Sequence, residues 1–439
     1  MSYSVLKKKV QMERVPPELV DAIIELLDKA SLLKCTLVCH LWSELAKAYV
    51  YKSISLDEGP REGHDFHSFS DFLESTSSVN VARHVKALGV SGSQVFTAST
   101  GMFGQIRPIP AQNLSLTASD IDRLLSRLPL LESLSLNALV LTCSISPPEH
   151  GWSTPRRLKR LQLRMVQYSI VENTIFPVTV DGHINPPDVT YRCGLIETLN
   201  LFSTVQYFKP IRVVVLGSKK YWTKDHGSCI KWAKPVTYQL SDAFNVEGLR
   251  LFDDEDSQIL LALLRSSPRC VANLRVLDGV TSDMQPDSGE VFNQAASSLR
   301  DVSVIMGEKR AGLVSIDISL CTNISSLNLT MNWFVPGALE RTLSTIADWS
   351  ESRARSSGSL LAPLANERTK GTFRLADDAL SIRERLTRVS FHFSDSWGGT
   401  LPQKEAGPLV KAVKEHLRKL DAKKVLDVQV IPGSPADFL

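Results

Sequence analysis

The chain has 439 residues, of which 43% are apolar and 22% charged, as in folded globular proteins and unlike disordered, collagenous or coiled-coil ones. Its 50 basic and 47 acidic side chains leave a formal charge of +3, which is too balanced to indicate nucleic acid or an anionic membrane as a partner.

The cysteines and the N-terminus favour a reducing compartment. The seven cysteines are scattered and include no CxxC pair, so neither a disulfide framework nor a structural zinc site is expected. The basic run Lys7-Lys8-Lys9 is not followed by an apolar segment, so it does not resemble a secretory signal. No apolar stretch approaches the roughly 20 residues of a membrane span. We therefore expect the protein in the cytoplasm, the nucleus or both, without membrane association.

Residues 1–14 are expected to be a flexible N-terminus, and residues 15–56 carry the clearest helical pattern. Pro16 and Pro17 suit the start of a helix, because the N–H that proline lacks has no partner there. Ser31 is expected to cap a second helix. The first helix carries two adjoining apolar stripes at helical spacing, one of Leu19, Ile23 and Leu26 and one of Val20, Ile24 and Leu27.

The apolar face of this first helix is wider than one small core can use. Trp42, Leu45 and Ala46 continue the apolar pattern into a third helix. Three short helices in about 30 residues bury little surface on their own. We therefore expect a partner to cover what the three helices leave exposed.

The order of Pro, Leu, Val-Cys and Trp in this segment resembles an F-box. Val15 and His40 depart from the family pattern, which usually has Leu and a basic residue there. Residues 49–56 resemble the aromatic-to-strand exit of F-box proteins of the kind expanded in fungi. A generic three-helix subdomain is the alternative. The residues that carry the resemblance are Pro16-Pro17-Glu18-Leu19-Val20, Ile23, Leu27, Leu32-Leu33, Leu37-Val38-Cys39 and Trp42.

The resemblance implies that residues 15–56 dock on the Skp-type adaptor of a cullin-RING ubiquitin ligase. The double stripe agrees with this, because one stripe can serve the internal core while the other remains as an apolar interface. Trp42 suits either the core or the interface. The residues expected to contact the adaptor are Pro16, Leu19, Val20, Ile23, Leu27, Leu32, Leu33, Val38 and Trp42.

Residues 57–439 repeat an apolar triplet at positions i, i+3 and i+5. The last positions of each copy alternate as in a strand, and several copies follow a helical stretch, which is typical of leucine-rich repeats. We expect an irregular α/β solenoid with its strands on the concave face. The ten copies begin at Val85, Leu131, Leu158, Ile196, Val246, Val271, Leu299, Ile324, Leu386 and Val425.

Helices are expected before several strands, at residues 67–75, 119–128 and 257–265, and an amphipathic helix behind Pro408 should precede the last strand. The copies are about 25 to over 60 residues apart, so the repeat is degenerate. Residues 210–240 are interpreted as an insertion and residues 351–371 as a flexible loop. The acidic run at residues 253–256 is interpreted as charge that favours a helix start rather than as a metal site.

Strand alternation predicts which residues face a substrate. Leu134, Leu161, Leu199 and Leu249 are the central residues of their copies and are expected in the core. The residues one position on should lie on the concave face, so the candidate substrate contacts are Ser135, Gln162 and Asn200.

No pattern in the chain indicates catalysis. It has no phosphate-binding GxxxxGK[ST] loop, no GxSxG elbow and no HExxH helix, so we expect no catalytic residue, no cofactor and no metal. The sequence thus predicts a non-catalytic substrate receptor of a cullin-RING ligase, bound to the adaptor and through it to the cullin, with an unidentified protein substrate. Two alternatives stay open: an F-box scaffold without ligase activity, and an enzyme built on the α/β repeats.

Overall fold

The computed structural model describes most of the chain between residues 16 and 431. The expected flexible N-terminus, the loop at residues 351–371 and the acidic run at residues 253–256 lie outside the described residues, as does most of the expected insertion. No helix in the described part is long and apolar enough to cross a bilayer. The described residues are 16–58, 65–92, 114–145, 155–175, 179–180, 183–184, 188–216, 222–223, 231–232, 239–251, 257–281, 283–284, 286–306, 314–315, 318–332, 374, 377–378, 380–381, 383–394 and 403–431.

Three helices open the described chain: α1 (Pro17–Glu25), α2 (Lys29–Cys35) and α3 (His40–Val50). They pack around a small core of their own, separate from the larger core of the rest of the protein. Leu27, Trp42 and Leu45 lie at the rim of this small core. Its buried members are Val20, Ile24, Leu32, Cys35, Ala46 and Val50.

The cap of α2 differs from the sequence prediction. Ser31 lies inside the helix, and Asp28 is the N-cap residue. The backbone of Asp28 is extended, and its carboxylate accepts the N–H of Ser31 at 2.7 Å. Both residues are good caps, but Asp28 stands where the chain is still extended, three residues before the N–H that its side chain reaches. The prediction of Ser31 as the cap was therefore wrong by one helical turn.

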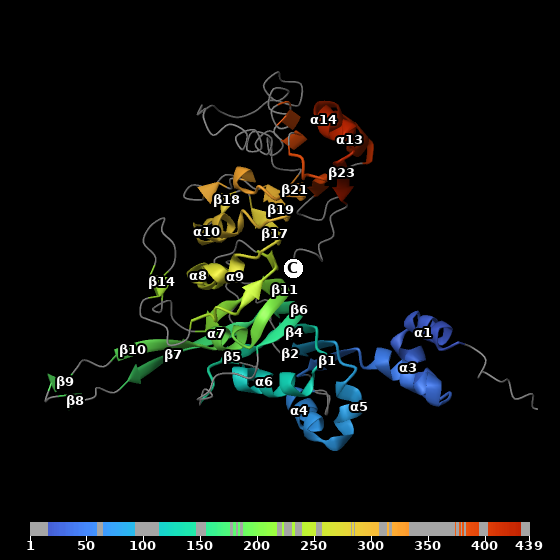
Figure 1. Ribbon diagram of the computed structural model, residues 1–439, viewed down its shortest axis with the longest axis vertical. Coiled ribbons are helices and arrows are strands. Elements are labelled where there is room, and N and C mark those ends of the chain that lie inside the picture. The colour runs from blue at the N-terminus through green and yellow to red at the C-terminus, as the bar shows by residue number, and fades with distance from the viewer. Residues whose placement is uncertain are drawn as a thin grey trace, which may run out of the picture.

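A sheet of 12 strands dominates the part of the chain that the structure describes (Figure 1). Its strands run parallel, and along the main path their order in the sheet is their order in the chain. One further strand, β15 (Asn245–Val246), pairs with β11. The path runs through β1 (Ser53–Asp57), β2 (Ala87–Ser91), β4 (Ser133–Asn137), β6 (Arg156–Arg164), β11 (Phe202–Ile211), β16 (Gly248–Arg250), β17 (Val276–Thr281), β19 (Asp301–Met306), β21 (Ser326–Asn332), β22 (Arg388–Ser394) and β23 (Leu426–Ile431).

Helices lie in several of the crossover connections between these parallel strands, as is usual for parallel pairing. The helices expected at residues 67–75, 119–128 and 257–265 are confirmed within one or two residues as α4, α6 and α8. The helices of this region are α4 (Phe66–Glu74), α5 (Val79–Ala82), α6 (Ala118–Arg127), α7 (Gly194–Leu199), α8 (Ser257–Ser266), α9 (Pro268–Val271), α10 (Pro286–Ala295), α13 (Gln403–His416) and α14 (Arg418–Ala422), with 3-10 turns η2 (Thr76–Ser78) and η4 (Ile318–Leu320). Figure 1 shows α8, α9 and α10 on one side of the sheet.

A second sheet and three short ladders were not predicted from the sequence. The second sheet consists of β3 (Ser115–Thr117), β5 (Val140–Thr142), β7 (Gln167–Ile175), β10 (Asp188–Cys193) and β12 (Val214–Leu216), with β10 antiparallel to β7. The ladders pair β8 (Thr179–Val180) with β9 (His183–Ile184), β13 (Trp222–Thr223) with β14 (Lys231–Trp232), and β18 (Asp283–Met284) with β20 (Val314–Ser315).

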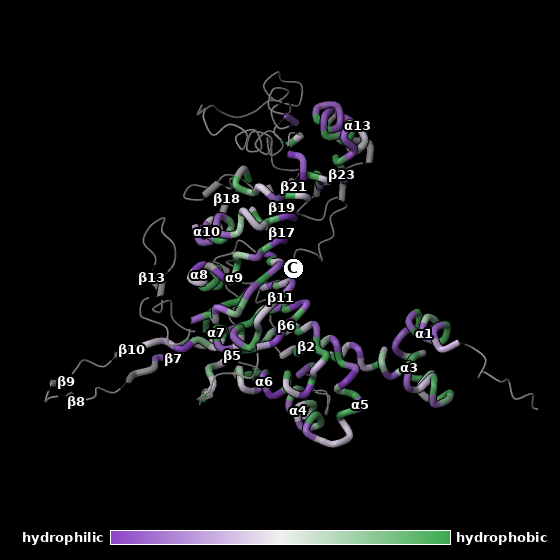
Figure 2. The backbone as a smooth tube through the Cα atoms, viewed as in Figure 1, coloured by the Kyte–Doolittle hydropathy of each residue, from purple (hydrophilic) through white to green (hydrophobic). Residues whose placement is uncertain are grey.

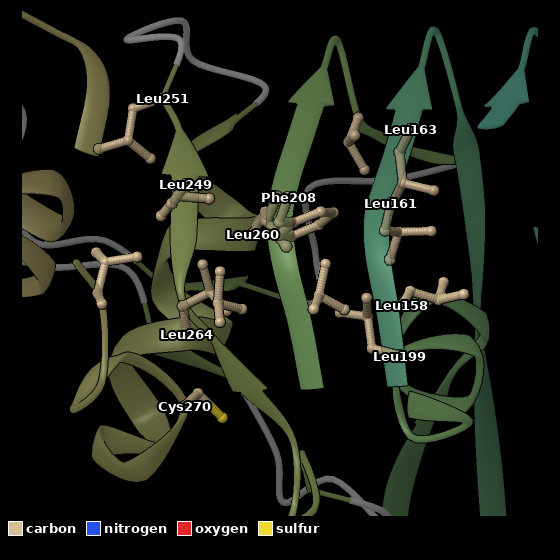
Figure 3. Packing of buried hydrophobic residues seen from close by; sticks show 14 of the residues in the cluster. Leu158, Leu161, Leu163, Leu199, Phe208, Leu249, Leu251, Leu260, Leu264 and Cys270 are labelled. Atoms are coloured by element: carbon tan, nitrogen blue, oxygen red, sulfur yellow. The ribbon is translucent and has the colours of Figure 1, made fainter. Parts of the chain in front are cut away.

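The central residues of the apolar triplets stack on one another across the main sheet. Leu134 pairs with Leu161, Leu161 with Phe208, and Phe208 with Leu249. Figure 3 shows Leu161, Phe208 and Leu249 side by side with the leucines of α8. The prediction that Leu134, Leu161, Leu199 and Leu249 are buried is confirmed. The mixed α/β fold, with an N-terminal helical region before parallel strands, is confirmed as well.

Two of the ten expected copies have a different register. The copy at Ile196 was wrong: Ile196 and Leu199 lie on α7, since their spacing of three suits a helix equally well. The strand of that repeat is β11, in which Val205 and Phe208 pair with Leu158 and Leu161. The copy at Val271 is displaced by three residues, because Leu277, and not Leu274, pairs with Leu249.

Candidate protein-binding site

The two apolar stripes of α1 have opposite environments. Val20 and Ile24 are 1% and 0% exposed and lie in the small core. Leu19, Ile23 and Leu26 are 57%, 47% and 87% exposed. The expectation that one stripe would be surplus to the core is therefore confirmed.

The second helix, the turn after it and the start of α3 add further exposed aliphatic side chains. Leu33, Leu37, Val38 and Leu41 are exposed large hydrophobic residues. Figure 2 shows apolar residues on α1 and α3, which lie at the periphery of the molecule. Single exposed apolar residues are ordinary, but so many within so short a segment indicate an interface. We call these residues the exposed apolar set: Leu19, Ile23, Leu26, Leu33, Leu37, Val38 and Leu41.

Several of the predicted adaptor contacts belong to this set and others do not. Leu19, Ile23, Leu33 and Val38 are exposed, as a contact residue must be, and so is Pro16. Two other predicted contacts, Leu27 and Trp42, are half-buried against the small core.

Val20 and Leu32 do not fit a role as direct contacts, because both lie inside the small core. Both were assigned from the family pattern, which does not distinguish apolar residues in the core from apolar residues on the surface. Leu26, Leu37 and Leu41 are exposed as well, although the sequence prediction did not include them among the contacts. Helical spacing already placed Leu26 in the stripe of Leu19, which was the available signal.

The three helices stand beyond the edge of the main sheet, on the side of β1 (Figure 1). Glu44 of α3 accepts hydrogen bonds from Lys47 at 2.9 Å and from Arg83 at 3.2 Å, which ties the helix to the turn after α5. The hydrogen bond from Lys47 lowers the pKa of the Glu44 carboxyl group. This link holds α3 through a polar contact and leaves the exposed apolar set uncovered.

The predicted substrate contacts lie in two different environments. Ser135 and Gln162 are neighbours in register on β4 and β6, and Lys209 of β11 continues their row. Both are partly exposed. Asn200 was wrongly placed on this face, because it lies in the turn after α7. There its amide donates to the carbonyl of Gln239 at 3.0 Å and its carbonyl accepts the N–H of Ser241 at 2.8 Å.

The middle of this open face is polar and cationic. Burial lowers the pKa of the Lys209 ammonium group, and the nearby charges of Arg250, Arg160 and Arg164 lower it further. Asp278 lies in the same neighbourhood, where it accepts a hydrogen bond from the hydroxyl of Tyr207 at 3.2 Å.

A buried ion pair fastens the second sheet to α7. Glu197 is almost fully buried, and its carboxylate lies 2.7 Å from a guanidinium nitrogen of Arg192. It also accepts the N–H of Ser144 at 2.9 Å. Burial raises the pKa of the neighbouring Cys143 thiol to about 11 and that of Cys193 to about 12, so both thiols are neutral at physiological pH. We assign this cluster a structural role.

Residues 12–57, about a tenth of the chain, match the F-box-like family model. The match spans α1, α2, α3 and β1, and it contains the whole exposed apolar set. F-box-like domains are modules of protein–protein interaction that typically bind Skp-type adaptors and are generally not catalytic. No curated protein matches the chain.

Proposed function

We propose that this chain is the substrate receptor of a cullin-RING ubiquitin ligase. The F-box-like segment docks on a Skp-type adaptor, and the repeats after it form a degenerate leucine-rich-repeat solenoid that binds a protein substrate. The observation that carries the proposal is the exposed apolar set within the segment that matches the F-box-like model. The receptor has no chemistry of its own, because its role is to hold the substrate near the ligase. It acts in the cytoplasm, the nucleus or both.

Energetics support a partner on the exposed apolar set. Burying one leucine or isoleucine side chain contributes about 1.5–3 kcal/mol. The exposed members gain little of this on folding, since Leu26 and Leu37 are 87% and 86% exposed. An adaptor that covers several of them gains enough to outweigh the loss of translational and rotational freedom on association.

The main sheet supports a separate substrate site. Its strands follow chain order, so each repeat adds one strand and one row of outward side chains. Central triplet residues face the core, while Ser135, Gln162 and Lys209 remain partly exposed in one row. Such a row can vary between proteins without disturbing the core, which is what recognition of a particular substrate requires.

Affinity purification with mass spectrometry tests the proposal. The tagged full-length chain is compared with a variant carrying Leu26→Glu and Leu37→Glu. The intact chain should recover a Skp-type adaptor and a cullin, and the variant should recover neither, while both recover the same substrate. Recovery of adaptor without cullin would instead indicate a scaffold without ligase activity. Equal recovery of the adaptor by both proteins would contradict the proposal.

A further inference from the structure

The residues two positions before the paired central residues of the strands form a row across the main sheet. Most of them immediately precede their strand, and Lys159 lies within β6. The N–H of most of these residues donates to the carbonyl of the preceding member of the row, as from Arg300 to Arg275 at 2.8 Å and from Ser325 to Arg300 at 2.7 Å. Their side chains therefore lie along a single edge, which we call the strand-start row. Its members include Lys52, Lys86, Glu132, Lys159, Glu247, Arg275, Arg300, Ser325 and Thr387.

In the first half of the strand-start row, the carboxylates Glu132 and Glu247 stand among the cations, and each forms an ion pair. Lys159 lies 2.8 Å from Glu132, and Arg157 lies 3.2 Å from Glu247. A hydrogen bond from Lys159 lowers the pKa of Glu132, and the charges of Lys159, Lys86 and Lys52 lower it further. Lys159 and the nearby Arg157 are thus paired with carboxylates of the chain itself.

In the second half the cations follow one another without an acid between them. Arg275 and Arg300 are consecutive in the row, and Arg385 lies in the turn before β22. These arginines line a pocket of about 450 Å³ that we call the arginine pocket. Its lining residues are Asn273, Arg275, Ser298, Arg300, Asn323, Ser325 and Arg385.

No acidic residue of the described part of the chain lines this pocket. Among the described residues, the side chains of Arg275 and Arg300 take part in no hydrogen bond or ion pair. Arg385 donates to the side-chain carbonyl of Asn323, which is a neutral partner. Asp301 lies near the pocket and accepts the hydroxyl of Ser325 at 3.3 Å. One nearby carboxylate faces three guanidinium groups, so the pocket carries a positive charge that the described part of the chain leaves unbalanced.

The pocket follows from a pattern in the repeats. In each, two polar residues flank the first apolar residue of the triplet, and that apolar residue is buried. Leu274, Leu299, Ile324 and Leu386 are the buried residues. The flanking pairs are Asn273 and Arg275, Ser298 and Arg300, Asn323 and Ser325, and Arg385 and Thr387. Because the buried residue anchors each pair, the polar side chains are held in two rows along one edge.

We infer that the arginine pocket binds an acidic segment of the recruited protein through a row of carboxylates. The inference rests on the proposed function and specifies the chemistry of its substrate. Guanidinium groups bind carboxylates through two parallel hydrogen bonds, which gives both energy and direction. Clustered cations without counter-charges repel one another, and an acidic ligand relieves that repulsion.

The spacing of the arginines suits several single charges. Neighbouring strands lie about 4.8 Å apart, so Arg275 and Arg300 start about that far apart, and Arg385 starts about two strands further on. Side chains on one face of an extended peptide recur about every 7 Å, which brings alternate acidic residues within reach of this row. Nucleic acid fits less well, because its binding relies on many phosphate contacts and this pocket offers three cations.

The arginine pocket and the exposed apolar set can act together in one chain. β17, which follows Arg275, is the sixth strand after β1 along the main sheet, which corresponds to roughly 30 Å. A ligand in the pocket therefore leaves the adaptor surface uncovered, and each interaction can be measured without the other.

Fluorescence anisotropy on the full chain tests the inference. The probe is a labelled peptide of alternating Glu and Ser, and the variant carries Arg275→Gln and Arg300→Gln. The matched control carries Arg157→Gln and Lys159→Gln, which removes the same charge from the two cations that pair with Glu247 and Glu132. We expect the dissociation constant to rise roughly tenfold or more in the pocket variant and little in the control. Melting temperatures should stay unchanged, since all four side chains are exposed.

Three results would overturn the inference. Equal loss in the two variants would show attraction to overall charge, and equal binding of a Gln–Ser peptide would show that carboxylates are not recognised. Tighter binding of a phosphoserine peptide or of single-stranded RNA, lost in the pocket variant, would assign the pocket to another anion. Adaptor binding is measured in parallel and should be unaffected by the pocket variant. If the wild-type chain does not bind the adaptor but still binds the acidic peptide, the proposed function is rejected and the inference about the arginine pocket remains.

Discussion

The N-terminal helices and the parallel sheet use their leucines in opposite ways. In β4 and β6 the triplet leucines are buried, and each lies against its counterpart on the next strand. In α1 one apolar stripe is buried and the other is exposed. A repeat array can cover its apolar residues with its own neighbouring repeats, whereas three short helices have too little of their own surface to do so. The exposed leucines therefore mark a candidate interface, and the buried ones stabilise the fold.

The largest expected difference between the two regions is in the cost of deleting a leucine. Leu161→Ala should lower the free energy of unfolding by about 2–5 kcal/mol, because it removes a fully buried side chain. Leu26→Ala should change it by less than about 0.5 kcal/mol, because the side chain is exposed. Ser135→Ala, on the open face of the sheet, should be tolerated like Leu26→Ala. Urea unfolding of the three variants measures these changes in the free energy of unfolding. Equal changes for Leu161→Ala and Leu26→Ala would contradict the distinction between buried and exposed leucines.

The next largest difference between the two regions is in the cost of neutralising a carboxylate. Glu197→Gln should destabilise the protein by about 3 kcal/mol, because it leaves the guanidinium group of Arg192 without its buried counter-charge. Glu44→Gln breaks an exposed link between α3 and Arg83 and should leave the melting temperature nearly unchanged. Thermal unfolding followed by circular dichroism compares the two. A larger shift for Glu44→Gln would show that the helices depend on polar contacts more than the sheet does.

The smallest expected effect lies at the start of α2. Asp28→Ala should lower the melting temperature slightly and Ser31→Ala less, because the Asp28 side chain is the cap. The hydrogen bond from the N–H of Ser31 lowers the pKa of the Asp28 carboxyl group. A lowered pKa in the folded state stabilises at neutral pH, and this contribution is lost as the pH falls through the folded-state pKa. The melting temperatures of the two variants should therefore differ at neutral pH and converge in acid. A lower melting temperature for Ser31→Ala than for Asp28→Ala would indicate that Ser31 is the cap.

Sequence patterns predicted the elements that have a strong period. α1, α6 and α8 carry apolar residues at helical spacing, and the division of α1 into two apolar stripes was correct, although Val20 of the core stripe was expected among the adaptor contacts. The segment at Ile196 was misassigned because apolar residues three apart fit both a helix and the start of a triplet. β11 was missed because Pro210 stands at the last position of its triplet, where most other copies have leucine or valine.

Other features of the structure are not marked by a periodic pattern of apolar residues in the sequence. β3 and β5 are three residues long, which is too short for an alternation to stand out, and they exist because the second sheet pairs them. The arginine pocket was missed for a different reason. Its residues Arg275 and Arg300 are 25 positions apart in the chain, and only the register of β17 and β19 shows that they are neighbours.

Titration of the purified full-length chain with a purified Skp-type adaptor by isothermal calorimetry is the most direct test of the central claim. The wild-type chain should bind, and Leu19→Asp with Ile23→Asp should abolish detectable binding, because two apolar contacts are lost and two carboxylates are buried unpaired. The control carries Val79→Asp and Leu130→Asp, whose side chains are similarly exposed but lie outside the F-box-like segment. It should bind like the wild type. Undiminished binding by the Leu19 and Ile23 variant, or an equal loss in the control, would contradict the account.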